Sequence, residues 1–394
     1  MQIYRITRNE DVYEVARENG ISPIKLYEYN DMTTKGPLPN GREMLIVAPT
    51  RTYNAKSGDK LNDIARRFNV KKDALLRMNP ELKGKEKLYT GQLLTVKEEG
   101  PLYGMINTNG YLFKDCRKER LISVMPYLGY VTVAAAVYKN GKISTLFPTE
   151  DAVSLIKSYG RVPMLRIYVE DMPSENEYKD FINSITVITK GGGFSGVTIS
   201  SLNTKKYDKH SRDALVFTAR RTLMEADLLL FAEGDAEKDT SYMEYADAGI
   251  LTYDKLHRDD IPSFKDGEES TLKAFADIGE SSRTFVEISS FAYCGQKFIE
   301  KSNAMQITDR HHADIINDED KKISIASYGK KKKHEIRYEN LENTKAKLEL
   351  ISELGFMGAA FDIGRVCTSD LMMLESMFNI ILNPIITPIS EQHL

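Results

Sequence analysis

The first hundred residues repeat one pattern of polar and apolar positions. Residues 2–48 and 51–97 align at an offset of 49, with a one-residue insertion before the last matched glycine. In the second copy an alternating stretch begins at Tyr53, and apolar residues then follow at helical spacing from 61 to 68. A shorter helix is expected over 72–78 and a closing strand over 92–96. Each repeat, at 1–49 and 50–99, is therefore predicted to fold as strand, helix, helix, strand.

From residue 100 onward, short apolar runs alternate with amphipathic stretches of helical period. Eight runs occur, at 103–107, 131–138, 162–169, 197–200, 228–232, 249–253, 285–291 and 356–361. Eight strand–helix units suit a (β/α)8 barrel, which usually has about 250 residues plus insertions. The gap after the seventh run is too long for one helix. We therefore predict an α/β fold for 100–394: a (β/α)8 TIM barrel with a small α+β insertion at about 297–339, preceded by the two βααβ repeats.

The second repeat resembles the LysM module. It carries Y-x-A-x-x-G-D-x-L-x-x-I-A-x-R-F-x-V, then L-x-x-x-N, then a G-Q-L strand. LysM modules bind N-acetylglucosamine polymers, such as peptidoglycan or chitin, in a shallow groove. The groove lies between the first strand–helix turn and the loop after the second helix. Carried over to this chain, the resemblance implies a groove lined by Gly58, Asp59, Lys60, Leu61, Met78, Asn79 and Pro80.

The first repeat departs from this pattern at the turn, where Asn9-Glu10 replaces Gly-Asp. Asn tolerates the left-handed backbone conformation that Gly adopts, so the fold is expected to survive. The close approach of a sugar to this turn is less assured. Two interpretations stay open for the first repeat, a second glycan site or a structural spacer.

The C-terminal part resembles the LysM-bearing family 18 glycoside hydrolases of bacterial spores. The run H-E-I-R-Y-E-N at 334–340 is similar to their "H-E-V-W-F-E-D", and the L-T-Y-D run at 251–254 is similar to their sixth-strand "M-T-Y". In the family, the tyrosine of that motif steadies the N-acetyl group of the substrate. The resemblance implies this role for Tyr253, although a half-buried strand aromatic is an equally good interpretation.

The catalytic motif of that family is missing from this chain. Family 18 enzymes carry D-G-x-D-x-D-x-E along the fourth strand, and the glutamate protonates the glycosidic oxygen. The matching stretch here is S-G-V-T-I-S-S-L, so Ser195, Thr198 and Ser200 replace the aspartates and Leu202 replaces the acid. Losing a general acid alone removes roughly 10²- to 10⁴-fold in rate. The platform tryptophan of strand eight is also absent, since the chain reads A-F-D-I at 360–363.

Other carboxylates follow predicted strands, and carboxyl ends of barrel strands form the active face. The candidates for the barrel mouth beside Tyr253 are Glu170 with Asp171, Glu233 with Asp235, Asp254, Glu287 and Asp362. A relocated acid among these residues is the rival to a barrel without activity. A hydrolase that does not use its substrate as nucleophile needs two carboxyls about 5–9.5 Å apart, a separation that only a structure can give.

The composition of the chain argues against several classes of partner. A net charge of −3, from 54 basic and 57 acidic residues, argues against nucleic acid as a partner. The chain has no apolar run of about 18 residues, so no membrane span is expected. The N-terminal stretch lacks the basic-then-apolar layout of a secretory signal. Three dispersed cysteines and the adjacent His311 and His312 have no metal-ligand spacing, so no metal and no cofactor are expected.

The hypothesis is a non-catalytic protein that binds peptidoglycan or another N-acetylglucosamine polymer. The resemblance implies synthesis in the mother-cell cytoplasm of a sporulating bacterium and deposition at the cortex–coat boundary of the spore, with spore coat proteins as further candidate partners. Two rivals stay open. One is an active spore-cortex N-acetylglucosaminidase with a relocated acid, and the other is a protein-interaction scaffold of the coat whose repeats no longer bind sugar.

Overall fold

The computed structural model describes the chain except residues 8–9, 35, 83–87, 203–206, 330–332 and 386–394. The chain forms two compact units. The first consists of Met1–Tyr103, Phe291–Lys345 and Cys367–Phe378, and the second of Gly104–Ser290, Ala346–Val366 and Asn379–Leu394. No helix within the described ranges is both long and apolar enough to cross a membrane.

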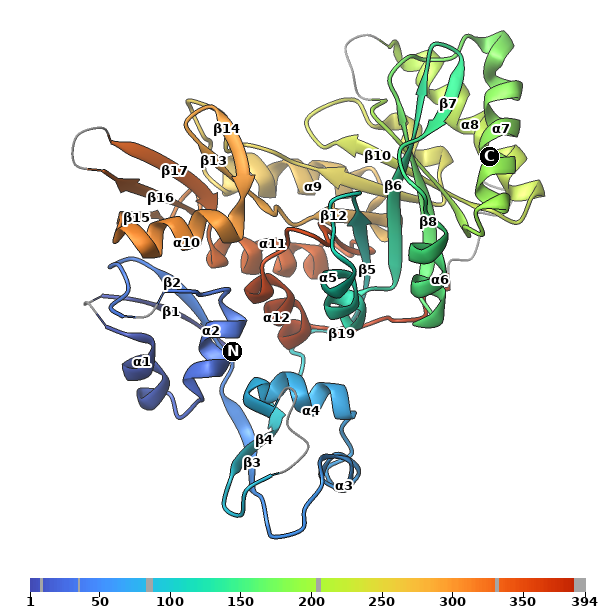
Figure 1. Cartoon of the computed structure of the whole chain (residues 1–394). Helices are drawn as coiled ribbons and strands as arrows, with labels where there is room; N and C mark the ends of the chain where they lie inside the picture. Colours follow the sequence, from blue (N-terminus) through green and yellow to red (C-terminus); the bar gives the residue numbers. More distant parts are fainter. Residues whose placement is uncertain (8–9, 35, 83–87, 203–206, 330–332, 386–394) are drawn as a thin grey trace. The chain divides into compact units, whose positions relative to one another are not determined.

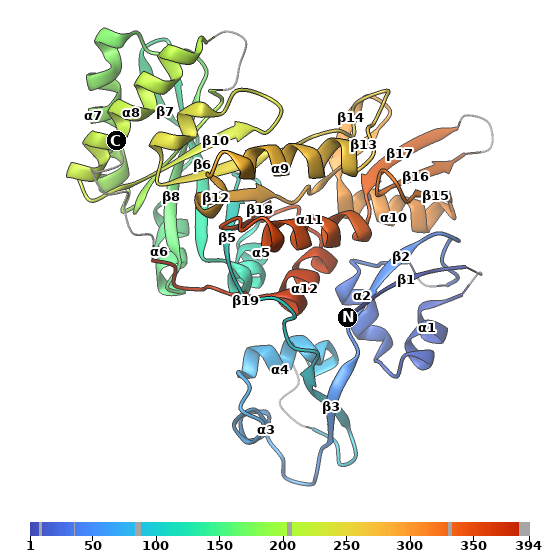
Figure 2. The same cartoon turned by 180° about the vertical axis from the view of Figure 1, so that it is seen from behind.

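Both N-terminal repeats have the predicted βααβ order (Figures 1 and 2). Repeat one, residues 1–49, contains β1 (Gln2–Arg5), α1 (Val12–Glu18), α2 (Pro23–Tyr29) and β2 (Glu43–Ile46). Repeat two, residues 50–99, contains β3 (Pro49–Asn54), α3 (Leu61–Arg67), α4 (Lys72–Met78), the turn η1 (Pro80–Leu82) and β4 (Leu93–Glu98). In each repeat the two strands pair antiparallel, and the helices bury their apolar positions in a core of that repeat's own. The predicted pattern is confirmed.

The second unit is a closed barrel of eight parallel strands. Their order around the barrel is β5 (Met105–Leu112), β6 (Tyr130–Lys139), β8 (Val162–Val169), β9 (Gly196–Ser200), β10 (Leu229–Asp235), β11 (Ala248–Thr252), β12 (Thr284–Glu287) and β18 (Gly358–Asp362), and β18 pairs with β5 to close it. Short strands β7 (Lys142–Thr145) and β19 (Asn379–Ile380) extend the sheet. The predicted TIM barrel is confirmed.

Helices connect successive barrel strands. They are α5 (Lys118–Val124), α6 (Glu150–Ser158), α7 (Tyr178–Gly191), α8 (Lys209–Glu225), α9 (Ser270–Asp277) and α11 (Leu341–Glu353), with a π-helical turn η5 (Lys265–Glu269) before α9. Inside the barrel, the ring of Tyr130 meets those of Phe231 and Phe285 edge-on at 5.3 and 5.9 Å between centroids. The barrel is therefore a packed core, and any site must lie at its mouth.

A five-stranded antiparallel sheet belongs to the first unit. Its order is β14 (Lys297–Glu300), β13 (Phe291–Cys294), β17 (His334–Glu339), β16 (Ile323–Tyr328) and β15 (Asp314–Asp318), and α10 (Lys301–His311) packs against it. Helix α12 (Thr368–Met377) is part of the same unit. The apolar run 285–291 was predicted as one strand. It divides here, because β12 ends at Glu287 and Phe291 begins the separate sheet.

Candidate glycan-binding and barrel-mouth sites

The first strand–helix turn of repeat two has the local structure that the LysM pattern demands. Gly58 has φ of +88°, a left-handed conformation that favours glycine. The Asp59 carboxylate accepts hydrogen bonds from the Lys56 backbone N–H at 2.8 Å and from the Tyr53 hydroxyl at 2.7 Å. These two bonds lower the pKa of Asp59, the Lys56 bond most. The turn is thus held in one shape, with Gly58 and Lys60 exposed to solvent.

Asn79, which was predicted to line the groove, lies in the interior of the repeat. Its side chain is only 2% exposed. The amide donates to the carbonyls of Leu75 (2.8 Å) and Thr95 (2.7 Å) and accepts from the Thr95 N–H (2.7 Å). Asn79 therefore ties α4 to β4. Of the other predicted groove residues, Leu61 and Pro80 are buried, whereas Asp59 and Met78 are partly exposed.

Repeat one reproduces this internal arrangement. The Asn30 amide donates to the carbonyls of Leu26 (3.1 Å) and Leu45 (3.0 Å), and its oxygen accepts from the Leu45 N–H (2.7 Å). The Tyr4 hydroxyl bonds to Glu10 at 3.2 Å, as Tyr53 does to Asp59. The duplication thus extends from the sequence to individual hydrogen bonds.

The outer surface of repeat one, in contrast, is used inside the first unit. The Asp31 carboxylate, at the position of Pro80, accepts from the N–H and the hydroxyl of Thr368, each at 2.6 Å, and so caps α12. The Tyr29 side chain, at the position of Met78, is only 4% exposed. Residues that correspond to the predicted groove of repeat two are therefore occupied by contacts with the protein itself.

A buried ion pair fixes repeat one to the inserted segment. Arg42 Nε lies 2.8 Å from Asp309 Oδ1, and both side chains are almost fully buried. The neighbouring Glu43 carboxylate accepts from the Leu341 N–H at 2.9 Å and from Arg5 at 2.9 Å. Charges removed from water in this way hold their place only when paired, so repeat one is an integral part of the first unit.

In the barrel, most of the stretch that matches the catalytic motif is buried, although Ser195 is partly exposed and Ser201 is exposed. Thr198 and Leu202 have no exposed surface, and Ser200 has 1%. The Ser200 hydroxyl donates to the Ile167 carbonyl at 3.2 Å. Leu202 lies two residues beyond the carboxyl end of β9, and a Cβ on Gly196 would lie 2.4 Å from the Leu229 carbonyl oxygen. The retained glycine therefore serves strand packing, and residues 195–202 offer no proton donor at the mouth.

An ion pair between β8 and β10, the strands on either side of β9, occupies the mouth instead. Arg166 on β8 binds Glu233 on β10 with both ends of its guanidinium, at 2.8 and 2.5 Å. The guanidinium also lies 4.8 Å from the ring centroid of Tyr111 and 4.4 Å from that of Tyr168. Arg166 was not among the predicted residues, because one arginine in an apolar strand gives no sequence signal of its own.

Most other predicted mouth carboxylates also have partners. Asp362 lies 2.8 Å from Arg365 and Asp254 lies 3.1 Å from the His257 ring. Glu170 and Asp235 each lie 2.7 Å from a lysine, Lys139 and Lys238. Burial raises the pKa of Asp362, which Arg365 opposes. Each of these four carboxylates therefore already lies against a basic side chain of the protein.

Glu287 is different. It is partly buried at the end of β12, and among the described residues no cationic side chain pairs with it. Burial, and to a smaller extent the nearby Glu233 carboxylate, raise the pKa of Glu287 to about 8. This carboxyl group can therefore keep its proton at neutral pH, as a general acid must.

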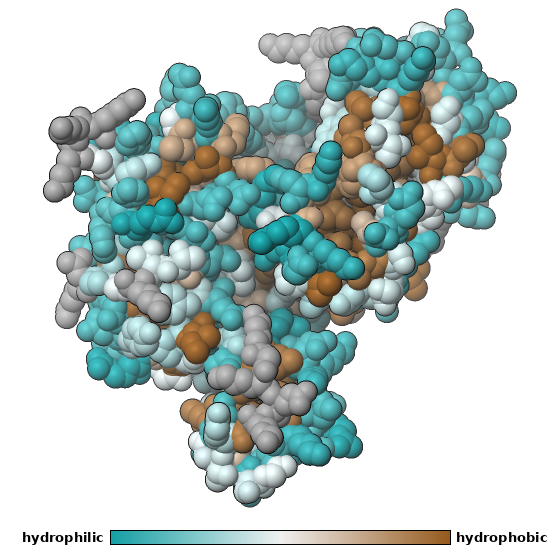
Figure 3. Space-filling view, in the orientation of Figure 1, coloured by the Kyte–Doolittle hydropathy of each residue, from teal (hydrophilic) through white to brown (hydrophobic). Residues whose placement is uncertain are grey.

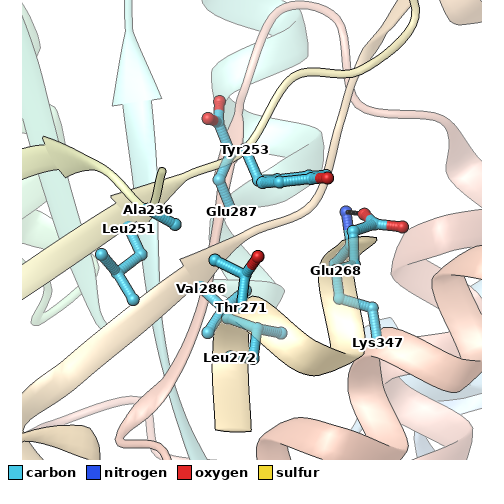
Figure 4. A pocket seen from close by; sticks show the side chains of 9 residues that line it. All are labelled: Ala236, Leu251, Tyr253, Glu268, Thr271, Leu272, Val286, Glu287 and Lys347. Atoms are coloured by element: carbon cyan, nitrogen blue, oxygen red, sulfur yellow. Dashed lines mark ion pairs between the residues drawn. The ribbon is translucent and has the colours of Figure 1, made fainter. Parts of the chain in front are cut away.

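Glu287 borders a small hollow of about 10 Å³ that Tyr253 also lines (Figure 4). The Tyr253 ring extends toward the buried Glu268, which lies 2.5 Å from Lys255 and 2.8 Å from Lys347. Burial alone would raise the pKa of Glu268, but the two lysines outweigh it and lower that pKa to about 2. A hollow of this size has room for roughly one water molecule and is far smaller than the roughly 300–1,000 Å³ of ordinary ligand pockets.

Comparison with known proteins agrees with this architecture. Residues 53–97 match the LysM domain family. No curated protein matches the sequence. Among solved structures, the spore cortex-lytic enzymes SleL of Bacillus megaterium QM B1551 and Bacillus cereus superpose with TM-scores of 0.72, at 18% and 16% identity. They cover 96% of this chain and 98% and 99% of theirs. A chitinase from Chromobacterium violaceum has a TM-score of 0.62 at 14% identity, over 69% of this chain and 98% of that one.

The fold and these matches define a chain that contains a LysM domain and a glycosidase-like parallel barrel. Residues 53–97 form the LysM domain, and the remaining likeness, at these identities, is one of fold. Among the described residues no group of three or more His, Cys, Asp or Glu side chains is arranged to hold a metal ion.

Proposed function

We propose that this protein binds peptidoglycan or a related N-acetylglucosamine polymer through repeat two, and that its barrel does not hydrolyse the polymer. The observation that carries the proposal is Leu202, which stands at the position of the acid and has no exposed surface. A barrel without a donor at this position keeps its scaffold but loses the proton transfer that cleaves a glycosidic bond.

The proposed location is the spore envelope, at the boundary of cortex and coat. Its support is the fold shared with two spore cortex-lytic enzymes over nearly the whole chain. We propose that repeat one is a structural module, because Asp31 and Tyr29 are engaged inside the first unit. Binding would then depend on repeat two alone.

The test uses the purified full-length chain with insoluble peptidoglycan and with chitin. We expect the protein to sediment with peptidoglycan and to release no new reducing ends during long incubation. Binding without cleavage supports the proposal. Sustained release of reducing ends by the unaltered protein contradicts the non-catalytic part, and failure to sediment with either polymer contradicts the binding part.

One observation favours the rival, a hydrolase with a relocated acid. Glu287 combines a position at the mouth with a pKa of about 8 and no cationic partner among the described residues. If the unaltered protein cleaves the polymer, Glu287→Gln should abolish cleavage, whereas Asp254→Asn should not, since Asp254 is exposed beside His257. If neither polymer binds, the rival of a coat scaffold that no longer recognises sugar takes precedence.

A further inference from the structure

The near-neutral charge of the chain conceals a strong asymmetry between the two repeats. Repeat two has twelve arginines and lysines over 51–97, against five aspartates and glutamates. Repeat one has six against seven over 2–48. Two modules with the same internal hydrogen bonds therefore differ strongly in charge: repeat two is basic and repeat one is nearly neutral.

The basic side chains of the two repeats also differ in how many of them form ion pairs. In repeat one, Arg5, Lys25 and Arg42 all form ion pairs within the first unit. In repeat two, Arg66 pairs with Asp63 and Arg77 with Glu375. The other seven basic side chains of repeat two that the structure describes are exposed, and none has a carboxylate within ion-pair distance among the described residues. Hydrophilic residues over α3 are visible at one side of repeat two in Figure 3.

Some of these cations border the predicted groove. Lys56 and Lys60 lie on either side of the Gly58-Asp59 turn, and both are exposed. A groove between such side chains attracts anions, because charges within about 10 Å of each other interact strongly at moderate salt.

Two arginines nearby lie over aromatic rings. The Arg51 guanidinium lies 4.9 Å from the ring centroid of Phe68, and that of Arg67 lies 5.1 Å from the centroid of Tyr53. Arg67 also donates to the Tyr53 hydroxyl at 3.2 Å. Guanidinium groups fixed in this way are preorganised to bind planar carboxylates.

We propose that repeat two selects an anionic form of its polymer: N-acetylglucosamine chains that carry free carboxylates, as peptidoglycan does on its lactyl and peptide groups. The inference rests on the proposed glycan-binding function and specifies its substrate class. Neutral chitin offers the same sugar but no partner for the unpaired cations, so it is the weaker ligand.

The test compares three polymers with the full-length protein: peptidoglycan, the same peptidoglycan with its carboxyl groups converted to amides, and chitin. We expect peptidoglycan to bind at least tenfold more tightly than the other two at low salt. Raising the salt from about 0.05 to 0.5 M should remove most of that preference, because the Debye length shortens several-fold. Equal binding of native and amidated peptidoglycan overturns the proposal and leaves glycan binding itself intact.

Amino-acid substitutions test which residues produce the preference for the anionic polymer. Arg51→Ala with Lys56→Ala, two exposed cations that are not among the predicted groove residues, should lower peptidoglycan affinity roughly tenfold and leave chitin binding unchanged, since each cation contributes a few-fold in such interfaces. Lys118→Ala with Lys190→Ala, two exposed lysines of the barrel, is the matched control and should change neither. Equal losses on chitin and peptidoglycan contradict the charge argument. Single-stranded DNA that binds as tightly as peptidoglycan shows a general polyanion site and also overturns the proposal.

Discussion

The buried pair between Arg42 and Asp309 gives the sharpest test of how repeat one is built into the protein. Replacing Arg42 with methionine keeps much of the side-chain volume but leaves the Asp309 carboxylate buried without its cation. It also removes the hydrogen bond from Arg42 to the Glu43 carbonyl at 2.5 Å. Removing one partner of a buried ion pair typically costs about 3–5 kcal/mol. We expect Arg42→Met to lower the free energy of unfolding by that amount.

The matched control is Arg66→Met, because Arg66 pairs with Asp63 on the surface and is 82% exposed. Surface pairs contribute about 0–1 kcal/mol, so this variant should unfold almost as the parent does. Both variants would be unfolded in urea and followed by far-ultraviolet circular dichroism, with hydrogen exchange at the Leu341 and Thr368 amides reporting on the first unit. Adding Asp309→Leu to Arg42→Met should recover much of the loss. If Arg42→Met lowers the free energy of unfolding as little as Arg66→Met does, this ion pair does not anchor repeat one and the reasoning is refuted.

Three further predictions concern other buried groups. Asn79→Ala should lower the free energy of unfolding by about 1–3 kcal/mol for each backbone group left buried without a partner, and Asn30→Ala should lower it by the same amount. Both variants would be measured by urea unfolding. A loss of stability in only one of the two variants would contradict the equivalence of Asn30 and Asn79. Because burial raises the pKa of Glu287 from 4.5 to about 8, the folded state binds the extra proton, so stability should fall as pH rises through that window and Glu287→Gln should remove the fall; an unchanged pH profile refutes this. Glu268→Gln should destabilise by about 3–5 kcal/mol, because it leaves two lysines buried without their carboxylate. Glu269→Gln, at a partly exposed carboxylate that pairs with Lys273, is the neighbouring control, and equal thermal midpoints of the two variants count against the ion cluster.

The sequence predicts the architecture well because periodicity reports directly on burial. The two repeats and the eight barrel runs follow from apolar spacing, and both arrangements are confirmed. The break at 287–291 could not be predicted, since Ile288 and Phe291 continue an apolar run whatever sheet each joins. The Ile288 N–H donates a hydrogen bond to the Ala360 carbonyl, and this bond keeps Ile288 with the barrel. The contact joins residues far apart in the sequence, so local sequence does not report it.

The sequence predicts the candidate site less well than it predicts the fold. Motif comparison identifies Leu202 at the position of the acid, but the ion pair of Arg166 with Glu233 depends on two strands that are 67 residues apart. The same holds for the cluster of Lys255, Glu268 and Lys347. Glu287 was one of several candidate carboxylates, and only its burial and lack of a cationic partner among the described residues distinguish it from the others. Charge partners across strands are a property of the fold, not of local pattern.

The two repeats separate what a module needs to fold from what it needs to bind. Asn30 and Asn79 make the same three hydrogen bonds, so the fold of each repeat is fixed by the same interior contacts. Their surfaces differ completely: the carboxylates of Asp31 and Glu43 cap elements of the first unit, whereas the cations of repeat two face solvent. A LysM-like sequence pattern therefore predicts the module but not its role. That role is decided by whether the residues outside the pattern are satisfied by the chain itself or left for a ligand.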